Sequence, residues 1–337
     1  MARRGTWPLV VAVGLFLAGA FLAGVLVGPV ELGVGRVLES FGARLPFLGL
    51  ETPLTDSEEA ILWELRLPRV VLGALVGGML AIAGASYQGV FRNPLADPYL
   101  LGVAAGAGLG ATVAVAYGPG LDSDFLPVAA FVGGAGSVAL AYALGRSTGG
   151  PAALILAGVT IASFFTAVQT FVQQQNSDTL QAVYSWILGR LATSGWDEVV
   201  RVLPYVALAT ATILVHRRLI DVLSLGDEEA ASLGVNVNRV RLLVVLAATV
   251  GTAAVVAVSG LIGFVGIIVP HAIRLLFGGS YRILLPVAAL GGAGFLVLAD
   301  VLARTVLSPG EVPIGVITAF FGAPFFALVL RTSRRSV

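Results

Sequence analysis

The sequence predicts an all-α membrane protein, and composition and hydropathy carry that prediction. Of the 337 residues, 57% are hydrophobic and only 12% are charged, and the mean hydropathy is +0.95. A soluble domain has about 25% charged residues, so this chain is not suited to an aqueous surface. A third observation is a series of apolar runs, each near the ~20 residues that a helix needs to cross a bilayer.

Ten such runs predict ten transmembrane helices and a single membrane domain over residues 1–337. The first run follows Arg3 and Arg4 and resembles a signal peptide, but about 20 apolar residues exceed the 7–15 of a signal-peptide core. We interpret it as a retained helix. The runs cover approximately residues 7–30, 70–89, 99–117, 125–144, 151–172, 199–215, 242–258, 261–277, 284–306 and 314–330.

The arginine distribution predicts the orientation of these helices. With ten spans both termini lie on one side, and placing them in the cytoplasm puts most of the 20 arginines there. This arrangement satisfies the positive-inside rule. We therefore expect a multi-pass protein of the cytoplasmic (inner) membrane, surrounded by the lipid bilayer, with both termini in the cytoplasm.

Two missing residue types exclude several chemistries. The chain has no Cys and no Lys. Thiolate metal sites, iron–sulfur clusters and thiol catalysis are excluded, as is a P-loop, whose Lys contacts nucleotide phosphates. We expect no catalytic residue, no metal site, no cofactor and no bound nucleic acid in this chain, so any ATP and Mg²⁺ belong to a partner.

Glycines at four-residue spacing predict close helix packing. They are Gly73 and Gly77, and Gly102, Gly106 and Gly110.

A weak internal echo also suggests an inverted repeat, an arrangement common in transporters. The segment from Arg69 through Gly84 to Pro94 is matched by the one from Arg241 through Gly260 to Pro270. Chance similarity between glycine-rich helices explains the echo equally well.

The longest predicted cytoplasmic loop, residues 216–241, has the sequence pattern of a short helix in its middle. Asp227 and the two acids after it suit a helix N-terminus, and Gly234 suits a helix end. An amphipathic helix on the cytoplasmic face would contact a partner protein. A solvated connection is the alternative interpretation.

Arginines on the outer side oppose the general charge trend. Arg66 and Arg69 precede the second apolar run, and Arg304 lies near the end of the ninth. Two explanations remain open from the sequence. The arginines pair with acids of this chain such as Glu64 or Asp300, or they bind carboxylates of an acidic partner, for which the guanidinium fork is suited.

Several motifs together resemble the FecCD family, the permease subunits of ABC importers for iron–siderophores, haem and vitamin B12. The resemblance covers nearly the whole chain from the second apolar run onward, and the combination is far more specific than any single piece. The motifs are Leu65–Arg69, Gly84, Gln88, Gly89–Pro98, Trp186–Gly189, Ala231–Gly234, Gly263–Gly266, Val269–Arg274, Glu311–Val316 and Gly322–Phe326.

The resemblance implies a type II importer permease with ten transmembrane helices per subunit, an inverted repeat and a homodimer whose interface forms the path. The other partners would be an ABC ATPase dimer on the cytoplasmic side and an extracytoplasmic substrate-binding protein outside. By resemblance, ATPase coupling falls on the loop at about 221–235, binding-protein docking on three arginines, and the path on polar residues of the fifth span. The residues are Leu225, Gly226, Ala230, Leu233 and Gly234 for coupling; Arg66, Arg69 and Arg304 for docking; and Ser163, Gln169 and Gln173 for the path.

The cargo and the energy source have alternatives. Iron chelates rank first as cargo and cobalamin next, and some relatives carry oxyanions. An ion-coupled secondary transporter acting without an ATPase is the competing function. It is disfavoured because few ionisable residues lie within the apolar runs, where coupled carriers usually keep some.

Overall fold

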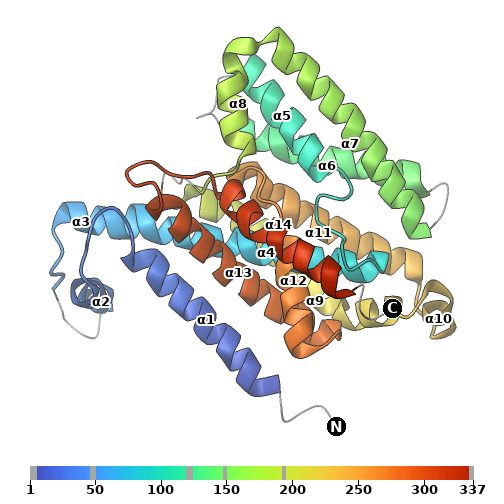
Figure 1. Ribbon diagram of the computed structural model, residues 1–337, viewed down its shortest axis with the longest axis horizontal. Helices are drawn as coiled ribbons and strands as arrows, with labels where there is room; N and C mark the ends of the chain where they lie inside the picture. The colour runs from blue at the N-terminus through green and yellow to red at the C-terminus, as the bar shows by residue number, and fades with distance from the viewer. Residues whose placement is uncertain (1–5, 46–50, 119–123, 147–149, 192–194, 334–337) are drawn as a thin grey trace.

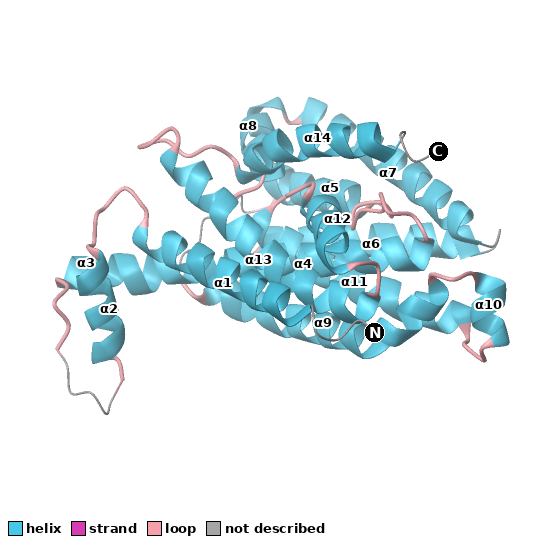
Figure 2. Ribbon diagram, turned by 60° about the horizontal axis from the view of Figure 1, so that its bottom comes forward, coloured by secondary structure: helices cyan, strands magenta, loops and turns pink. Residues whose placement is uncertain are grey.

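The all-α prediction is confirmed. A computed structural model describes residues 6–45, 51–118, 124–146, 150–191 and 195–333. Every regular element in this part of the chain is a helix, as Figure 2 shows. Arg3 and Arg4, which enter the orientation argument, lie outside the described residues.

All ten predicted runs coincide with helices, but the helices fall into two length classes. Within the described residues, 7 helices are long and apolar enough to cross a membrane, while α5, α12 and the apolar part of α14 are shorter. The count of ten spans therefore stays a prediction. The long helices are α1 (Thr6–Leu26), α4 (Leu67–Phe91), α6 (Phe125–Arg146), α7 (Gly150–Gln175), α9 (Asp197–Leu223), α11 (Val237–Ser259) and α13 (Tyr281–Thr305); the shorter ones are α5 (Val103–Tyr117), α12 (Val265–Phe277) and α14 (Ile314–Ser333).

Short helices that the hydropathy analysis did not predict lie between the long ones. On the chain between α1 and α4, α2 is amphipathic and buries Val37 and Ser40 while leaving Val34 and Leu38 exposed. The predicted cytoplasmic helix is present as α10. These elements are α2 (Val34–Ala43), α3 (Asp56–Ala60), the π-helix η1 (Ile61–Arg66), the 3₁₀-helix η2 (Ser177–Thr179), α8 (Leu180–Ile187) and α10 (Asp227–Ser232).

The molecule is elongated along its helices, and its two ends differ. Figure 1 shows α2 and α3 at one end of the long axis and α10 at the other. The start of α1 and the end of α14 both point toward the α10 end. The helices therefore place the two termini on the same side, as ten crossings require, while the assignment of that side to the cytoplasm stays a prediction.

Helix α4 is the central element of the bundle. It packs against α9, α11, α12 and α13, and most of its residues are buried. It continues without a break from α3 and η1, so one helix runs from Asp56 to Phe91 over 36 residues. Pro68 has no N–H for the usual bond to the carbonyl four residues earlier, and the turn before it is widened into a π-helix.

Close backbone contacts explain several glycines. A Cβ added at Gly77 would lie 2.2 Å from the carbonyl oxygen of Gly292 on α13, and one at Gly106 would lie 2.2 Å from that of Gly133 on α6. The packing role predicted for these two is therefore confirmed. Gly102 precedes α5 with a φ of +87°, which favours glycine, and it is also closely packed, because an added Cβ would lie 2.6 Å from the Ser137 hydroxyl of α6.

The sequence echo does not mark equivalent positions. Gly84 lies inside α4 whereas Gly260 follows the end of α11, and Pro94 lies in a loop whereas Pro270 lies inside α12. Helix neighbours support the repeat better. If the ten apolar helices are counted in chain order, the second (α4) packs against the eighth and ninth (α12 and α13). The seventh (α11) packs in the same way against the third and fourth (α5 and α6). This reciprocity is what two related halves of five helices would give.

Candidate functional site

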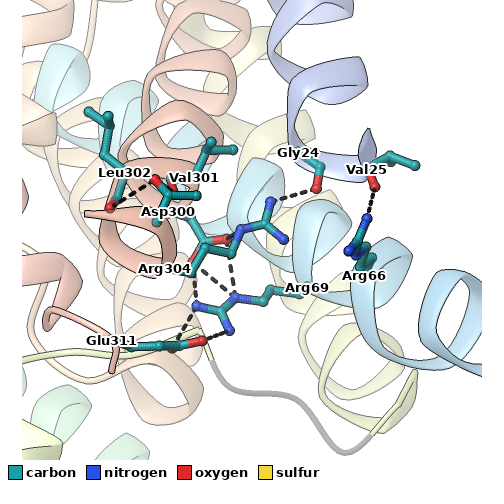
Figure 3. A network of polar contacts seen from close by, with 10 residues as sticks. Gly24, Val25, Arg66, Arg69, Asp300, Val301, Leu302, Arg304 and Glu311 are labelled. Carbon is teal, nitrogen blue, oxygen red and sulfur yellow. Dashed lines mark hydrogen bonds and ion pairs between the residues drawn. The ribbon is translucent and has the colours of Figure 1, made fainter. Parts of the chain in front are cut away.

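The outer arginine cluster lies where α1, α4 and α13 meet, and Figure 3 shows its members. Arg66, at the end of η1, is only 5% exposed. Its Nη1 donates to the carbonyl oxygens of Val25 at 3.0 Å and Leu26 at 3.1 Å, and its Nη2 donates to that of Val30. The last carbonyls of a helix have no partner within the helix, so Arg66 caps the C-terminus of α1.

Arg69, one turn further along α4, is held by two carboxylates. Its Nε and Nη2 donate to Oδ1 of Asp300 at 3.0 and 2.8 Å. Its Nη1 and Nη2 donate to the two carboxylate oxygens of Glu311 at 2.8 and 2.9 Å. Such forked pairs are among the stronger charge-assisted hydrogen bonds, so Arg69 joins α4 to α13 and to the loop after α13.

Arg304 completes the cluster from α13. It is 4% exposed, its Nε lies 3.5 Å from Oδ2 of Asp300, and its Nη2 donates to the carbonyl of Gly24. Two arginines, Arg66 and Arg304, thus bind carbonyls near the end of α1. In the group of Arg69, Arg304, Asp300 and Glu311 the formal charges balance.

The first of the two explanations, pairing with an acid of the same chain, is confirmed for Asp300, which pairs with Arg69 and Arg304. The acid predicted as an alternative partner, Glu64, forms no ion pair among the described residues, and Glu311 takes the second position on Arg69. The Arg69 guanidinium lowers the pKa of the Glu311 carboxyl below its ordinary value. Docking of an acidic partner stays a prediction. Because Arg66 and Arg304 are buried, Arg69 is the one of the three that such a partner could contact directly.

A small cavity of about 220 Å³ opens beside Arg69. One of its lining residues is a further arginine that the sequence did not single out. Arg190 lines this cavity, is exposed and has no ion pair among the described residues. Glu311 also lines it. Sequence reasoning missed Glu311 as a partner: it lies in the loop after α13, 242 positions from Arg69, and no sequence signal pairs the two.

The short helix predicted within residues 216–241 is confirmed as α10, but the loop itself is shorter than predicted, because α9 continues to Leu223 and α11 begins at Val237. Gly226 is the N-cap at a φ of +148°, and Gly234 follows the helix at a φ of +79°. Ala230 is fully buried, whereas Leu225 and Leu233 are 64% and 63% exposed. The result is a helix fixed on its inner face with an exposed leucine at each end, and its function in coupling stays a prediction.

The three predicted path residues on α7 do not share one environment. Ser163 lies in an open groove with Thr166 and Thr170, and its hydroxyl donates to the carbonyl of Val159. Gln169 is only 9% exposed and lies against Gly108 of α5.

Gln173 is half-buried one turn further along α7. The structure therefore places Ser163 on an accessible small-residue face and turns Gln169 into the packing with α5.

The fold and these sites define a multi-pass helical membrane protein whose long loop presents a short exposed helix. The model of the FecCD transport family matches residues 15–332, and the chain belongs to this family. The chain is 40% identical over 331 residues to the ABC transporter permease protein YvrB of Bacillus subtilis, covering 95% of this chain and 92% of that protein.

A second relative is the cobalamin import system permease protein BtuC of Halobacterium salinarum. It is 42% identical over 284 residues, covering 84% of this chain and 76% of the relative. Further relatives are named as permeases for Fe(3+)-citrate, iron(3+)-hydroxamate and hemin.

The fold also matches a solved structure described as an inward-facing conformation of a metal-chelate type ABC transporter. The TM-score is 0.85 at 30% identity, covering 96% of this chain and 99% of that chain. The relatives are permease subunits of ABC importers, and transport permease subunits are not enzymes.

Proposed function

We propose that the chain is the transmembrane subunit of a type II ABC importer that moves an iron chelate (a siderophore complex or haem) or cobalamin into the cytoplasm. A binding protein delivers the cargo outside, and a separate ATPase dimer supplies the energy. The match of the FecCD family to residues 15–332 is the observation that carries this proposal. Relatives named for cobalamin and hemin import support these cargo classes.

The proposed assembly is a homodimer of ten-helix subunits with an inverted repeat in each. The accessible face of α7, with Ser163, Thr166 and Thr170, supplies small polar side chains for a path between the copies. Gln169, which packs against α5, enters the path only if α7 and α5 separate, and Gln173 one turn further is half-buried. A chelate arrives with its metal already coordinated, so the path needs no metal ligands.

The energy step takes place outside this chain. ATP and Mg²⁺ bind the ATPase dimer, and Leu225 and Leu233 insert into that partner beside α10. Leu225 and Leu233 are 64% and 63% exposed at the two ends of α10, so both side chains are accessible to an apolar surface of the partner. Closure of the ATPase dimer displaces α10 and shifts the helices between outward-open and inward-open arrangements.

The proposal is tested by reconstituting the chain with its ATPase and binding protein in proteoliposomes. Leu225→Ser and Leu233→Ser should each weaken ATPase binding by about tenfold, because an apolar contact in the interface is lost. Leu307→Ser, at an equally exposed leucine (64%) of the outer loop, is the control and should bind the ATPase normally.

Uptake itself distinguishes the importer from a coupled carrier. Uptake of a ferric siderophore, haem or cobalamin should require ATP, the ATPase and the binding protein. Uptake that proceeds without the ATPase and collapses when the proton or sodium gradient is dissipated would establish the secondary transporter instead.

A further inference from the structure

One carboxylate of the exposed helix α10 forms ion pairs with two of the membrane-helix segments. Asp227, the first residue of α10, accepts from Nη2 of Arg241 through both oxygens, at 2.9 and 3.0 Å. Its Oδ1 also lies 3.3 Å from Nη2 of Arg92. Arg241 belongs to α11 and Arg92 directly follows α4, so Asp227 connects three elements.

Burial makes the Arg241 contact unusually important. The Arg241 side chain is 5% exposed, and Asp227 is its ion-pair partner among the described residues. A buried cation is stable only when it is paired, and removing its partner is far more costly than breaking a surface pair. The pair therefore holds α10 against the start of α11 in a fixed position.

The Arg92 contact connects α10 to the centre of the bundle. Arg92 ends α4 in a left-handed conformation with a φ of +51°, and its N–H donates to the carbonyl of Gly89. One turn earlier, Gln88 donates to the carbonyl of Gly266 at 3.1 Å and accepts from Arg274 at 3.0 Å. The same end of α4 is thus bonded to α12, so a pull on Arg92 reaches α4 and α12 together.

The neighbouring acid on α10 has no such partner. Glu228 is exposed and forms no ion pair among the described residues. Asp227 is therefore distinguished from Glu228 by geometry rather than by charge, and Glu228 provides a matched control one position away.

We propose that Asp227 is a positioning residue that transmits the displacement of α10 to α4 and α11 by holding Arg92 and Arg241 together. This inference rests on the proposed function of α10 as the contact with the ATPase. Asp227 itself does not need to touch the ATPase, because the exposed leucines flanking α10 make that contact.

The test measures coupling and geometry in the assembled importer. Asp227→Asn should bind the ATPase within about twofold of wild type, because both leucines remain. The cargo moved per ATP hydrolysed should fall roughly tenfold, the range expected when one coupling contact between two sites is removed. Glu228→Gln should leave both quantities unchanged.

A distance measurement gives a readout that a loss of stability would not produce. Because the chain has no Cys, Ser232→Cys on α10 and Leu95→Cys after α4 can carry nitroxide labels without other substitutions. In the parent chain the distance between the labels should be the same with and without ATP, because the two segments move together. With Asp227→Asn the distance should change when ATP binds.

Arg92→Gln tests the same link from outside α10 and keeps the inference falsifiable if Asp227→Asn fails to assemble. It should lower cargo moved per ATP, and Arg92→Gln with Asp227→Asn should be no worse than Asp227→Asn alone, because they remove one shared contact. Normal coupling in Arg92→Gln, or normal coupling in an assembled Asp227→Asn complex, overturns the inference. Failure of the proposed function is a different result: the wild-type chain then binds no ATPase, and the inference falls with it.

Discussion

The two ends of α4 use arginine in opposite ways. At the outer end Arg66, Arg69 and Arg304 are enclosed by carbonyls and carboxylates of their own chain. At the inner end Arg92 is 39% exposed and bonds to a carboxylate on a small helix that projects from the bundle. The outer end is a largely buried junction within this chain, whereas the inner end supports an exposed helix. The positions of these arginines in the sequence do not reveal the difference, because it depends on which carboxylates lie near each of them in the fold.

The outer junction should be sensitive to loss of its shared acid. Asp300→Ala leaves Arg69 and Arg304 without their common partner in a buried site, and such a change costs about 3–5 kcal/mol. We expect a large fall in the thermal unfolding temperature of the detergent-solubilised protein. Unfolding at the wild-type temperature would mean that this cluster does not hold the outer end together.

Helix packing between the two ends should be almost as sensitive. A Cβ at Gly84 would lie 2.1 Å from the carbonyl oxygen of Gly266, so Gly84→Ala forces α4 and α12 apart. Overpacking of this kind costs about 1–3 kcal/mol and should lower the unfolding temperature. Gly136→Ala on α6 is the matched control, because nothing lies within 4 Å of its added Cβ. Equal unfolding temperatures for the two variants would contradict the close contact.

The smallest effect is expected at the rim of the outer junction. Glu311 is 48% exposed, so Glu311→Gln should cost less than about 1 kcal/mol. Its pKa is lowered in the folded protein by Arg69, so its contribution is present above the ordinary Glu pKa of about 4.3. It is lost as the pH falls through the lower folded value.

Unfolding temperatures of wild type and Glu311→Gln should therefore differ at neutral pH and converge in acid. A difference that persists unchanged in acid would show that it does not come from the charge of Glu311.

Much of the fold follows from local sequence, because hydropathy and turn residues act over short distances. The positions of the ten apolar helices and of α10, with Gly226 and Gly234 at its ends, were predicted for this reason. The helix α2 was not, because its ten residues have no long apolar run and bury only Val37 and Ser40.

The sites depend on contacts between distant segments, and there the sequence was less informative. Pairing of an outer arginine with Asp300 was foreseen as one of two possibilities, but the carbonyls of α1 that bind Arg66 could not be. Backbone acceptors carry no sequence signal. Asp227 was identified as a helix-start acid, but nothing in the sequence indicated that Arg92 and Arg241 are its partners.

The uninterrupted helix from Asp56 to Phe91 has a further consequence for movement. At ~1.5 Å per residue, its 36 residues form a lever roughly 50 Å long. A lever of that length converts a tilt of a few degrees into a shift of several ångströms at its tips. The widened turn of η1 ends two residues before Pro68, close to the outer tip of this helix. Because the rest of the helix is continuous, a displacement of Arg92 also displaces Arg69.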